Sequence, residues 1–288
     1  MYNGIASLDH PVVAVKDMEE SRNLYVRLGF MVPPRGSHVE WGTGNWCIMF
    51  PDDYLELRGI LDSERNTLNL NEVLERYGEG VMGVAFGTTS AQRNYEQMLD
   101  NGLRPKEVIY LSRNFELPEG WVQPRFALCF PDTNDIVGLM HVVLCQHLTP
   151  ELIRRPNFLE HENGVNGVIS VTGVIDDIDL VEVAQRRLLG DDAIMRMEGG
   201  ICLTLPSGQN IHLLSKEIYR QRYGHLSKII NADVTCYLGV ITLRVDLIDK
   251  VKSVLRRNRI PFDMPEHNSV LVEAKYSCGV VLEFIEQK

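Results

Sequence analysis

The chain has 288 residues, of which 44% are hydrophobic, so it is long enough to bury the core of one large domain or two ordinary ones. Its 39 acidic residues outnumber its 29 lysines and arginines, which gives a formal net charge of −10. A non-specific nucleic-acid binder or a protein bound to an anionic membrane needs a basic face, and this balance argues against both classes.

The first residues and the cysteines indicate the compartment. The sequence begins without a basic segment followed by an apolar run, and no apolar run reaches the roughly 18 residues of a membrane helix. The six cysteines lie far apart, without the C-x-x-C pair typical of a zinc ribbon. We therefore expect a reduced, globular, cytoplasmic protein.

In chain order, a short apolar strand, a helix and a closing strand form the first unit of a repeat. These elements are expected at residues 8–16, 18–28 and 54–58, and the second unit has them at 81–88, 92–100 and 139–145. The opening strands are rich in β-branched residues, as strands prefer. Asp17 directly precedes the first helix and is its predicted N-cap.

The same order continues in the second half of the chain. The third unit has its strand, helix and closing strand at 167–175, 180–189 and 210–214, and the fourth has them at 237–245, 246–257 and 280–285. Asp177 is the predicted N-cap of the third helix. Four recurrences predict an α+β fold built from four βαβββ units. The alternative is an ordinary α+β protein whose segments are similar by accident.

The first unit carries four short motifs in a fixed order. They are LDH at 8–10, LGF at 28–30, His38 followed by GTGN at 42–45, and YLEL at 54–57. This set resembles the glyoxalase-like subgroup of the vicinal oxygen chelate superfamily, which includes glyoxalase I, extradiol dioxygenases and the fosfomycin- and bleomycin-resistance proteins. The segments QHLTPE at 146–151 and HENG at 161–164 also resemble the inter-domain link of members with four units.

The resemblance implies a domain organisation. Two units pair so that their sheets curve into a cleft, which holds a divalent metal bound by a His or Gln near each first strand and a Glu on each last strand. We expect an N-terminal domain at 1–148 (units about 5–62 and 78–147), a linker at 149–164 and a C-terminal domain at 165–288 (units about 165–216 and 234–288).

His10 and Glu56 are the predicted metal ligands of the first unit. Side chains alternate across a strand, so Leu55 and Leu57 share the face that a helix covers. Tyr54, Glu56 and Arg58 share the other face, which must be a cleft or water. A carboxylate and a neighbouring imidazole suit a borderline divalent ion. The alternative is a solvated Glu56 and a His10 that caps a turn before Pro11.

The second unit offers weaker candidates. The position that matches His10 falls near Met82, a poor ligand. His141 is the best candidate on the closing strand, although Gln146 or His147 could take its place. A structural histidine satisfied by hydrogen bonds remains an alternative reading of His141.

The second cleft is expected to be degenerate. His212 and Glu283 each stand four residues after a glycine on a closing strand, whereas Ser170 and Gly239 stand where histidines are expected. Two ligands make a weak site, so we expect the C-terminal domain to serve packing.

Arg35, His38 and Asn45 follow the first helix and are the predicted substrate-binding residues. A guanidinium, an imidazole and an amide near a metal could orient a carboxylate or carbonyl group. The alternative is a polar surface connection.

The resemblance implies a lyase or isomerase that depends on a divalent metal (Zn, Ni, Mn or Fe). Glu56 would be a ligand and the catalytic base for an enediolate-type intermediate of a small carbonyl or hydroxy-acid substrate. The alternatives are an extradiol-type ring-cleaving dioxygenase, and a non-catalytic binding or sequestration protein with a vestigial metal site. We expect a small molecule as the partner, with no nucleic acid or membrane, and a monomer or homodimer.

Overall fold

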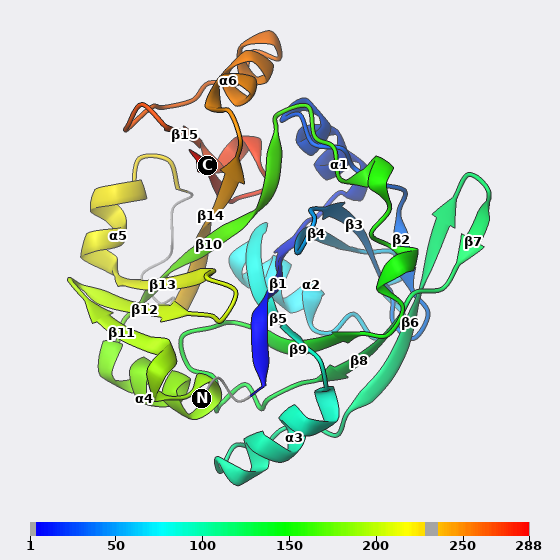
Figure 1. The fold of residues 1–288 in the computed structure, drawn as a ribbon, viewed down its shortest axis with the longest axis vertical. Coiled ribbons are helices and arrows are strands. Elements are labelled where there is room, and N and C mark those ends of the chain that lie inside the picture. The colour runs from blue at the N-terminus through cyan, green and yellow to red at the C-terminus, as the bar shows by residue number, and fades with distance from the viewer. Residues whose placement is uncertain (1–3, 228–235, 288) are drawn as a thin grey trace.

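The structure is a computed structural model that describes residues 4–227 and 236–287 (Figure 1). It is an α+β fold, as the repeat predicts. The described ranges leave out the outermost residues of the two predicted domains. They also leave out residues 234 and 235, where the predicted fourth unit begins. The domain boundaries themselves stay a prediction.

The first two units have the predicted order of elements. Unit one contains β1 (Ile5–Ala14), α1 (Met18–Arg27), β2 (Gly36–His38), β3 (Thr43–Met49) and β4 (Tyr54–Ile60). Unit two contains β5 (Gly80–Thr88), α3 (Ala91–Asp100), β6 (Ile109–Leu117), β7 (Gly120–Val122), β8 (Arg125–Cys129) and β9 (Val142–His147). Asp17 caps α1 as predicted, because its side chain accepts from the backbone N–H of Glu20.

The last two units follow two short 3₁₀ turns, Pro150–Leu152 and Pro156–Phe158. Unit three contains β10 (Val165–Ile175), α4 (Ile178–Leu189), β11 (Ile194–Met197), β12 (Gly200–Thr204) and β13 (Asn210–Ser215). Unit four contains β14 (Cys236–Val245), α6 (Ile248–Arg257), β15 (Ser269–Val272) and β16 (Val281–Glu286). An isolated bridge between Asp263 and Leu271 stands where a third closing strand is expected. Asp177 caps α4 as predicted.

Two helices lie between the units and were not predicted from the repeat. The first, α2 (Leu70–Tyr77), packs Leu70 and Val73 against Val12 and Met82 of the first sheet. The second, α5 (Lys216–Tyr223), contributes Tyr219 to a buried cluster of the second half. Both helices therefore fill part of the face of the sheet on which a binding cleft is expected.

The strands of units one and two close into a ring. The order β1-β4-β3-β2-β6-β8-β9-β5 ends where β5 pairs with β1, and the ladder between β2 and β6 joins the two units on the other side. In units three and four, β14 and β10 form the centre of a more open sheet (Figure 1). The interior of the first ring is thus the more enclosed of the two clefts.

The two halves share one continuous apolar core, which includes Leu8 and Phe86 from the first half and Leu243 and Phe284 from the second. A polar contact also joins them, since Gln209 donates to the backbone oxygen of Leu8 and to Asp53. Among the described residues, no helix is long and apolar enough to cross a membrane.

Candidate functional site

A small inner cavity of about 40 Å³ lies inside the first ring of strands. Its wall contains apolar side chains from β6, β8 and β9 and a set of polar ones, namely His10, His38, Asn45, Tyr54, Glu56, Arg58 and Arg113. Such a concentration of buried charge inside an apolar shell is the usual mark of a binding or catalytic site.

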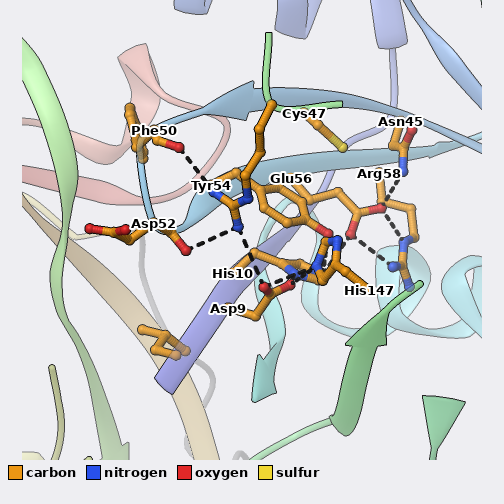
Figure 2. Close-up of polar contacts among 12 residues, drawn as sticks. Asp9, His10, Asn45, Cys47, Phe50, Asp52, Tyr54, Glu56, Arg58 and His147 are labelled. Atoms are coloured by element: carbon orange, nitrogen blue, oxygen red, sulfur yellow. Dashed lines mark hydrogen bonds and ion pairs between the residues drawn. The ribbon is translucent and has the colours of Figure 1, made fainter. Parts of the chain in front are cut away.

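His10 and Glu56 come together as predicted from strand alternation. The parallel ladder of β1 and β4 pairs Val12 with Glu56, and His10 Nε2 lies 3.1 Å from Glu56 Oε2. A register irregularity in β1 lets the neighbouring Asp9 reach the same side, where its carboxylate lies 2.7 Å from His10 Nδ1 (Figure 2). Burial alone would lower the pKa of His10, but the hydrogen bonds to Asp9 and Glu56 raise it above the ordinary value.

Glu56 is held from its other side by two further residues. Arg58 donates to both carboxylate oxygens, with Nε 3.0 Å from Oε1 and Nη2 2.9 Å from Oε2, and Asn45 Nδ2 donates to Oε1 at 2.8 Å (Figure 2). Glu56 is only 2% exposed. Burial opposes its ionisation, yet Arg58 and His10 keep the pKa of Glu56 well below its usual range. Glu56 is therefore an anion.

The spacing of the pair is compatible with a shared divalent ion as well as with the direct hydrogen bond. Two ligands with bonds of about 2.1 Å on one ion stand roughly 3 Å apart, as His10 Nε2 and Glu56 Oε2 do. A carboxylate on the second ring nitrogen, here Asp9, is the usual support of a metal-bound histidine. Asn45 anchors the other oxygen of Glu56. The donor set of these residues therefore fits a divalent ion held by two side chains.

A second group of potential ligands contacts the Nδ1 side of His10 through Asp9. The ligand atoms of Asp9, Cys145 and His147 lie within 4.8 Å of one another. His147 Nε2 is 2.9 Å from Asp9 Oδ2, so it extends the chain of contacts from Glu56 through His10 and Asp9. Burial opposes a charge on Asp9, but the neighbouring His147 and His10 lower its pKa. Gln146, another candidate, instead accepts from the N–H of Ala91 at the start of α3.

His141 is not where its prediction put it. The closing strand β9 begins at Val142, so the predicted strand at 139–145 exists but its expected start was three residues too early, and His141 does not line the inner cavity. In the β1–β4 ladder of unit one, Glu56 pairs with Val12. At the equivalent position of the β5–β9 ladder in unit two, Val143 pairs with Ala85. Val143, which has no ligand atom, therefore takes the place of Glu56 in unit two. A continuous apolar run hides this register in the sequence.

An outer cavity of about 340 Å³ adjoins the inner one. Arg58 and Val143 line both cavities and so form the partition between them. The outer cavity combines apolar side chains such as Met82 and Phe130 with the polar groups of His141 and Lys106. It has the size and lining of a small-molecule pocket.

The structure brings two of the three predicted substrate-binding residues to the inner cavity. His38 and Asn45 line it, and Arg35 lines neither cavity. The ring of His38 is held by Thr43, with Nδ1 2.8 Å from the hydroxyl oxygen. Burial and the neighbouring Arg58 lower the pKa of His38 to about 3, so its imidazole is neutral.

Arg113 is a site residue that was not predicted from the sequence. It lies on β6 directly opposite His38, at the ladder that closes the ring. In β6 the buried positions alternate through Leu111, Arg113, Phe115 and Leu117. The sequence did contain a signal for this residue, because Arg113 stands at a position of an alternating strand where its neighbours on the same face are apolar.

The C-terminal cleft contains the two ligand-type residues that were expected on its closing strands, His212 and Glu283. The ladders pair Thr172 with His212 and Thr242 with Glu283, in the register of Val12 and Glu56. Glu283 accepts from the hydroxyl of Thr242, and His212 Nδ1 is buried with no hydrogen-bond partner among the described residues. Ser170, at the opening strand, adds only a hydroxyl.

Comparisons with known proteins agree with this architecture. The model of the glyoxalase-like domain family matches residues 8–189. A search of curated proteins found no match. Among solved structures, a hypothetical protein from Staphylococcus aureus is similar over 97% of this chain and 98% of its own, at 10% identity and a TM-score of 0.69.

Two further solved structures share the fold at low identity. A mutant of 4-hydroxymandelate synthase from Streptomyces coelicolor is 11% identical with a TM-score of 0.59, over 98% of this chain and 93% of its own. A fusion protein of a xylose isomerase-like TIM barrel and 4-hydroxyphenylpyruvate dioxygenase is 13% identical with a TM-score of 0.57, over 100% of this chain and 49% of its own. The family match extends over more than half of the chain, through the unit that carries His10 and Glu56. This chain therefore belongs to the glyoxalase-like domain family of the vicinal oxygen chelate superfamily.

Proposed function

We propose that the first ring of strands is the active site of a divalent-metal-dependent lyase or isomerase, acting on a small carbonyl or hydroxy-acid substrate. The observation that carries this proposal is the buried contact of 3.1 Å between His10 Nε2 and Glu56 Oε2, with Asp9 on the other ring nitrogen. A substrate would enter through the outer cavity and reach the pair past Arg58.

His10 and Glu56 would hold the ion, and Asn45 and Asp9 would fix their orientation. When bound, a divalent ion supplies a Lewis acid that stabilises negative charge on neighbouring substrate oxygens. Arg58 adds a cation beside the same region and Asn45 an amide. Together these groups suit a reaction in which a proton leaves a carbon next to a carbonyl or hydroxyl group.

Glu56 is the proposed base, and Arg58 controls its basicity. While Arg58 donates to both of its oxygens, the low pKa of Glu56 makes it a weak base. Arg58 also lines the outer cavity, so it has space to turn toward an incoming anionic substrate. Such a movement would leave Glu56 without its strongest cation and raise its pKa. The proposal therefore requires Arg58 to move during turnover.

Metal analysis tests the proposal first. The full chain is purified without chelator, loaded in turn with Zn²⁺, Ni²⁺, Mn²⁺ and Fe²⁺, and assayed for stoichiometric metal. We expect His10→Ala and Glu56→Gln to lose the ion and His225→Ala, an exposed histidine of the second half, to retain it. His141→Ala and His147→Ala determine whether either of those residues is a ligand. If no metal binds under any loading condition, the catalytic proposal fails.

A proton-exchange assay then tests the reaction type. Metal-loaded protein is incubated in D₂O with a panel of 2-oxo and 2-hydroxy acids and ketoaldehydes, and deuterium incorporation next to the oxygenated carbon is followed by NMR. We expect exchange that EDTA and Glu56→Gln abolish. Oxygen consumption with catechols would instead indicate the dioxygenase, although the described residues of the second cleft offer only His212 and Glu283 for iron.

A non-catalytic binding protein is the second candidate. It is favoured by Val143, which leaves unit two without a ligand at the position of Glu56, and by the four hydrogen bonds that already satisfy Glu56. Ligand binding that persists in EDTA without any exchange would support it. In either case we propose a small-molecule partner, and because one chain completes both clefts, a monomer or homodimer suffices.

A further inference from the structure

Arg113 is a buried cation without an anionic partner. Its side chain lines the inner cavity, and the residue is 4% exposed. Its Nη1 donates to Asn45 Oδ1 at 3.1 Å and to Cys47 Sγ at 2.7 Å, and its guanidinium lies 5.3 Å from the ring of Phe115. Its Nε is buried with no hydrogen-bond partner among the described residues. None of these contacts supplies a negative charge.

Neighbouring groups form no direct ion pair with this charge, although Glu56 attracts it from a distance and helps to raise the pKa of Arg113. Cys47 is a neutral thiol, since burial raises its pKa to about 11. Glu56 is the closest carboxylate in the wall of the cavity, but Arg58 and His10 already form ion pairs with it, and no ion pair of Arg113 within 4.0 Å occurs in the described parts of the chain. An arginine is charged at every physiological pH. An unpaired buried charge is strongly unfavourable, so the cavity is electrostatically incomplete as it stands.

The other arginine of the cavity shows the usual arrangement. Arg58 is matched by a bidentate contact with Glu56, whereas Arg113 reaches only an amide oxygen and a sulfur atom. Arg113 nevertheless occupies the buried phase of β6, between the apolar Leu111 and Phe115. An unpaired guanidinium on the buried face of a strand indicates that the missing anion comes from a ligand.

We infer that Arg113 is the anchoring residue for the single carboxylate group of the substrate, which binds in the inner cavity. This inference rests on the proposed function for the identity of the site and adds the acidic group of the substrate. The cavity of about 40 Å³ corresponds to roughly three water molecules, close to the size of a carboxylate group. A guanidinium with free N–H groups binds a carboxylate through charge-assisted hydrogen bonds.

The position of this group relates the acid to the reacting pair. Asn45 donates to Glu56 through Nδ2 and accepts from Arg113 through Oδ1, so a single amide separates the two charged groups. A carboxylate on Arg113 would therefore lie one amide away from Glu56, in the cavity that His10 also lines. The remainder of the ligand would pass between Arg58 and Val143 into the outer cavity.

Binding of matched acids and amides to metal-free protein in EDTA tests the inference. The probes are glycolate with glycolamide, and 3-phenylpropanoate with 3-phenylpropanamide, whose phenyl group can reach the outer cavity. We expect at least one acid to bind about tenfold or more tightly than its amide by calorimetry or ligand-observed NMR, since a charged hydrogen bond is at stake. Arg113→Gln should abolish this difference, and Arg125→Gln, an exposed arginine on β8, should preserve it.

Three results would overturn the inference: no acid binds, an acid and its amide bind equally, or Arg113→Gln keeps the preference. None of them depends on metal loading or turnover, so failure here is distinguishable from failure of the proposed function. A thermal scan of Arg113→Gln and Arg113→Met without ligand excludes a merely structural role. We expect at least one variant to keep a Tm within about 3 °C of the parent, whereas loss of a structural ion pair would lower both well beyond that.

Discussion

The ion pair of Glu56 and Arg58 offers the sharpest test of how the site is held together. Their side chains are 2% and 14% exposed, so solvent screens the pair little. Removing one member of a buried pair typically costs about 3–5 kcal/mol, because the other charge is left buried. The two substitutions are not equivalent, however, because Glu56 has partners besides Arg58.

Glu56→Gln leaves both Arg58 and His10 without their shared carboxylate, whereas Arg58→Met leaves Glu56 with His10 and Asn45. We therefore expect a loss of about 4 kcal/mol for Glu56→Gln and about 2 kcal/mol for Arg58→Met. The double variant should lose less than the sum, by roughly 1–3 kcal/mol of coupling.

Guanidinium chloride unfolding at pH 7, followed by far-UV circular dichroism, measures these differences from the transition midpoints. A thermal scan should give a shift of about 2–4 °C for each kcal/mol in a protein of this size. The reasoning is refuted if Arg58→Met destabilises as much as Glu56→Gln, or if the two effects are additive. Equal losses would mean that His10 and Asn45 do not hold the charge of Glu56 once Arg58 is removed. Additive losses would mean that Arg58 and Glu56 do not depend on each other for charge compensation.

Two predictions concern the contact between the halves. Burial raises the pKa of Asp53 to about 7, so the protonated form is favoured in the folded state and the stabilisation from this group is lost as the pH rises through about 7. The unfolding free energy of the parent relative to Asp53→Asn should therefore fall between about pH 4 and pH 7 and level off above that, and a flat difference would contradict the assignment. Gln209→Ala removes hydrogen bonds to Leu8, Asp53 and Val168 and should cost about 2–3 kcal/mol in urea unfolding, compared with a few tenths for the exposed Gln123→Ala.

Local signals in the sequence were sufficient for most of the fold. The four repeat helices begin within two residues of their predicted starts, and Asp17 and Asp177 mark two of those starts by capping them. The pairing of His10 with Glu56 follows from alternation, since Tyr54, Glu56 and Arg58 share one face of a strand that runs beside β1. The same alternation already pointed to Arg58 as a cavity residue.

The features that were not predicted from the sequence depend on pairing between strands that lie far apart in the chain. Arg113 reaches the cavity only because β2 and β6, from different units, pair to close the ring. Neither strand indicates this partner by itself, so Arg35 was the more obvious cation from its position in the chain. The helices α2 and α5 fall between repeat units, where the repeat makes no prediction.

The register of β9 explains why unit two lacks a ligand and suggests how to supply one. Val143 stands opposite Ala85 as Glu56 stands opposite Val12, and it lines both cavities. Val143→Glu would put a carboxylate across the cavity from His10 and Glu56, at the position where the superfamily pattern has a metal ligand.

If His10 and Glu56 bind a divalent ion, a third protein ligand should tighten the Kd for Zn²⁺ or Mn²⁺ by about tenfold or more in a competition titration, which corresponds to about 1.4 kcal/mol. Gln146→Glu adds the same charge on the same strand but at the contact with Ala91, and should leave the affinity unchanged. Equal affinities for the parent and a folded Val143→Glu variant would mean that the ion, if any, binds elsewhere. The cluster of Asp9, Cys145 and His147 would then be the next candidate among the described residues, and Cys145→Ser would test whether it holds the ion.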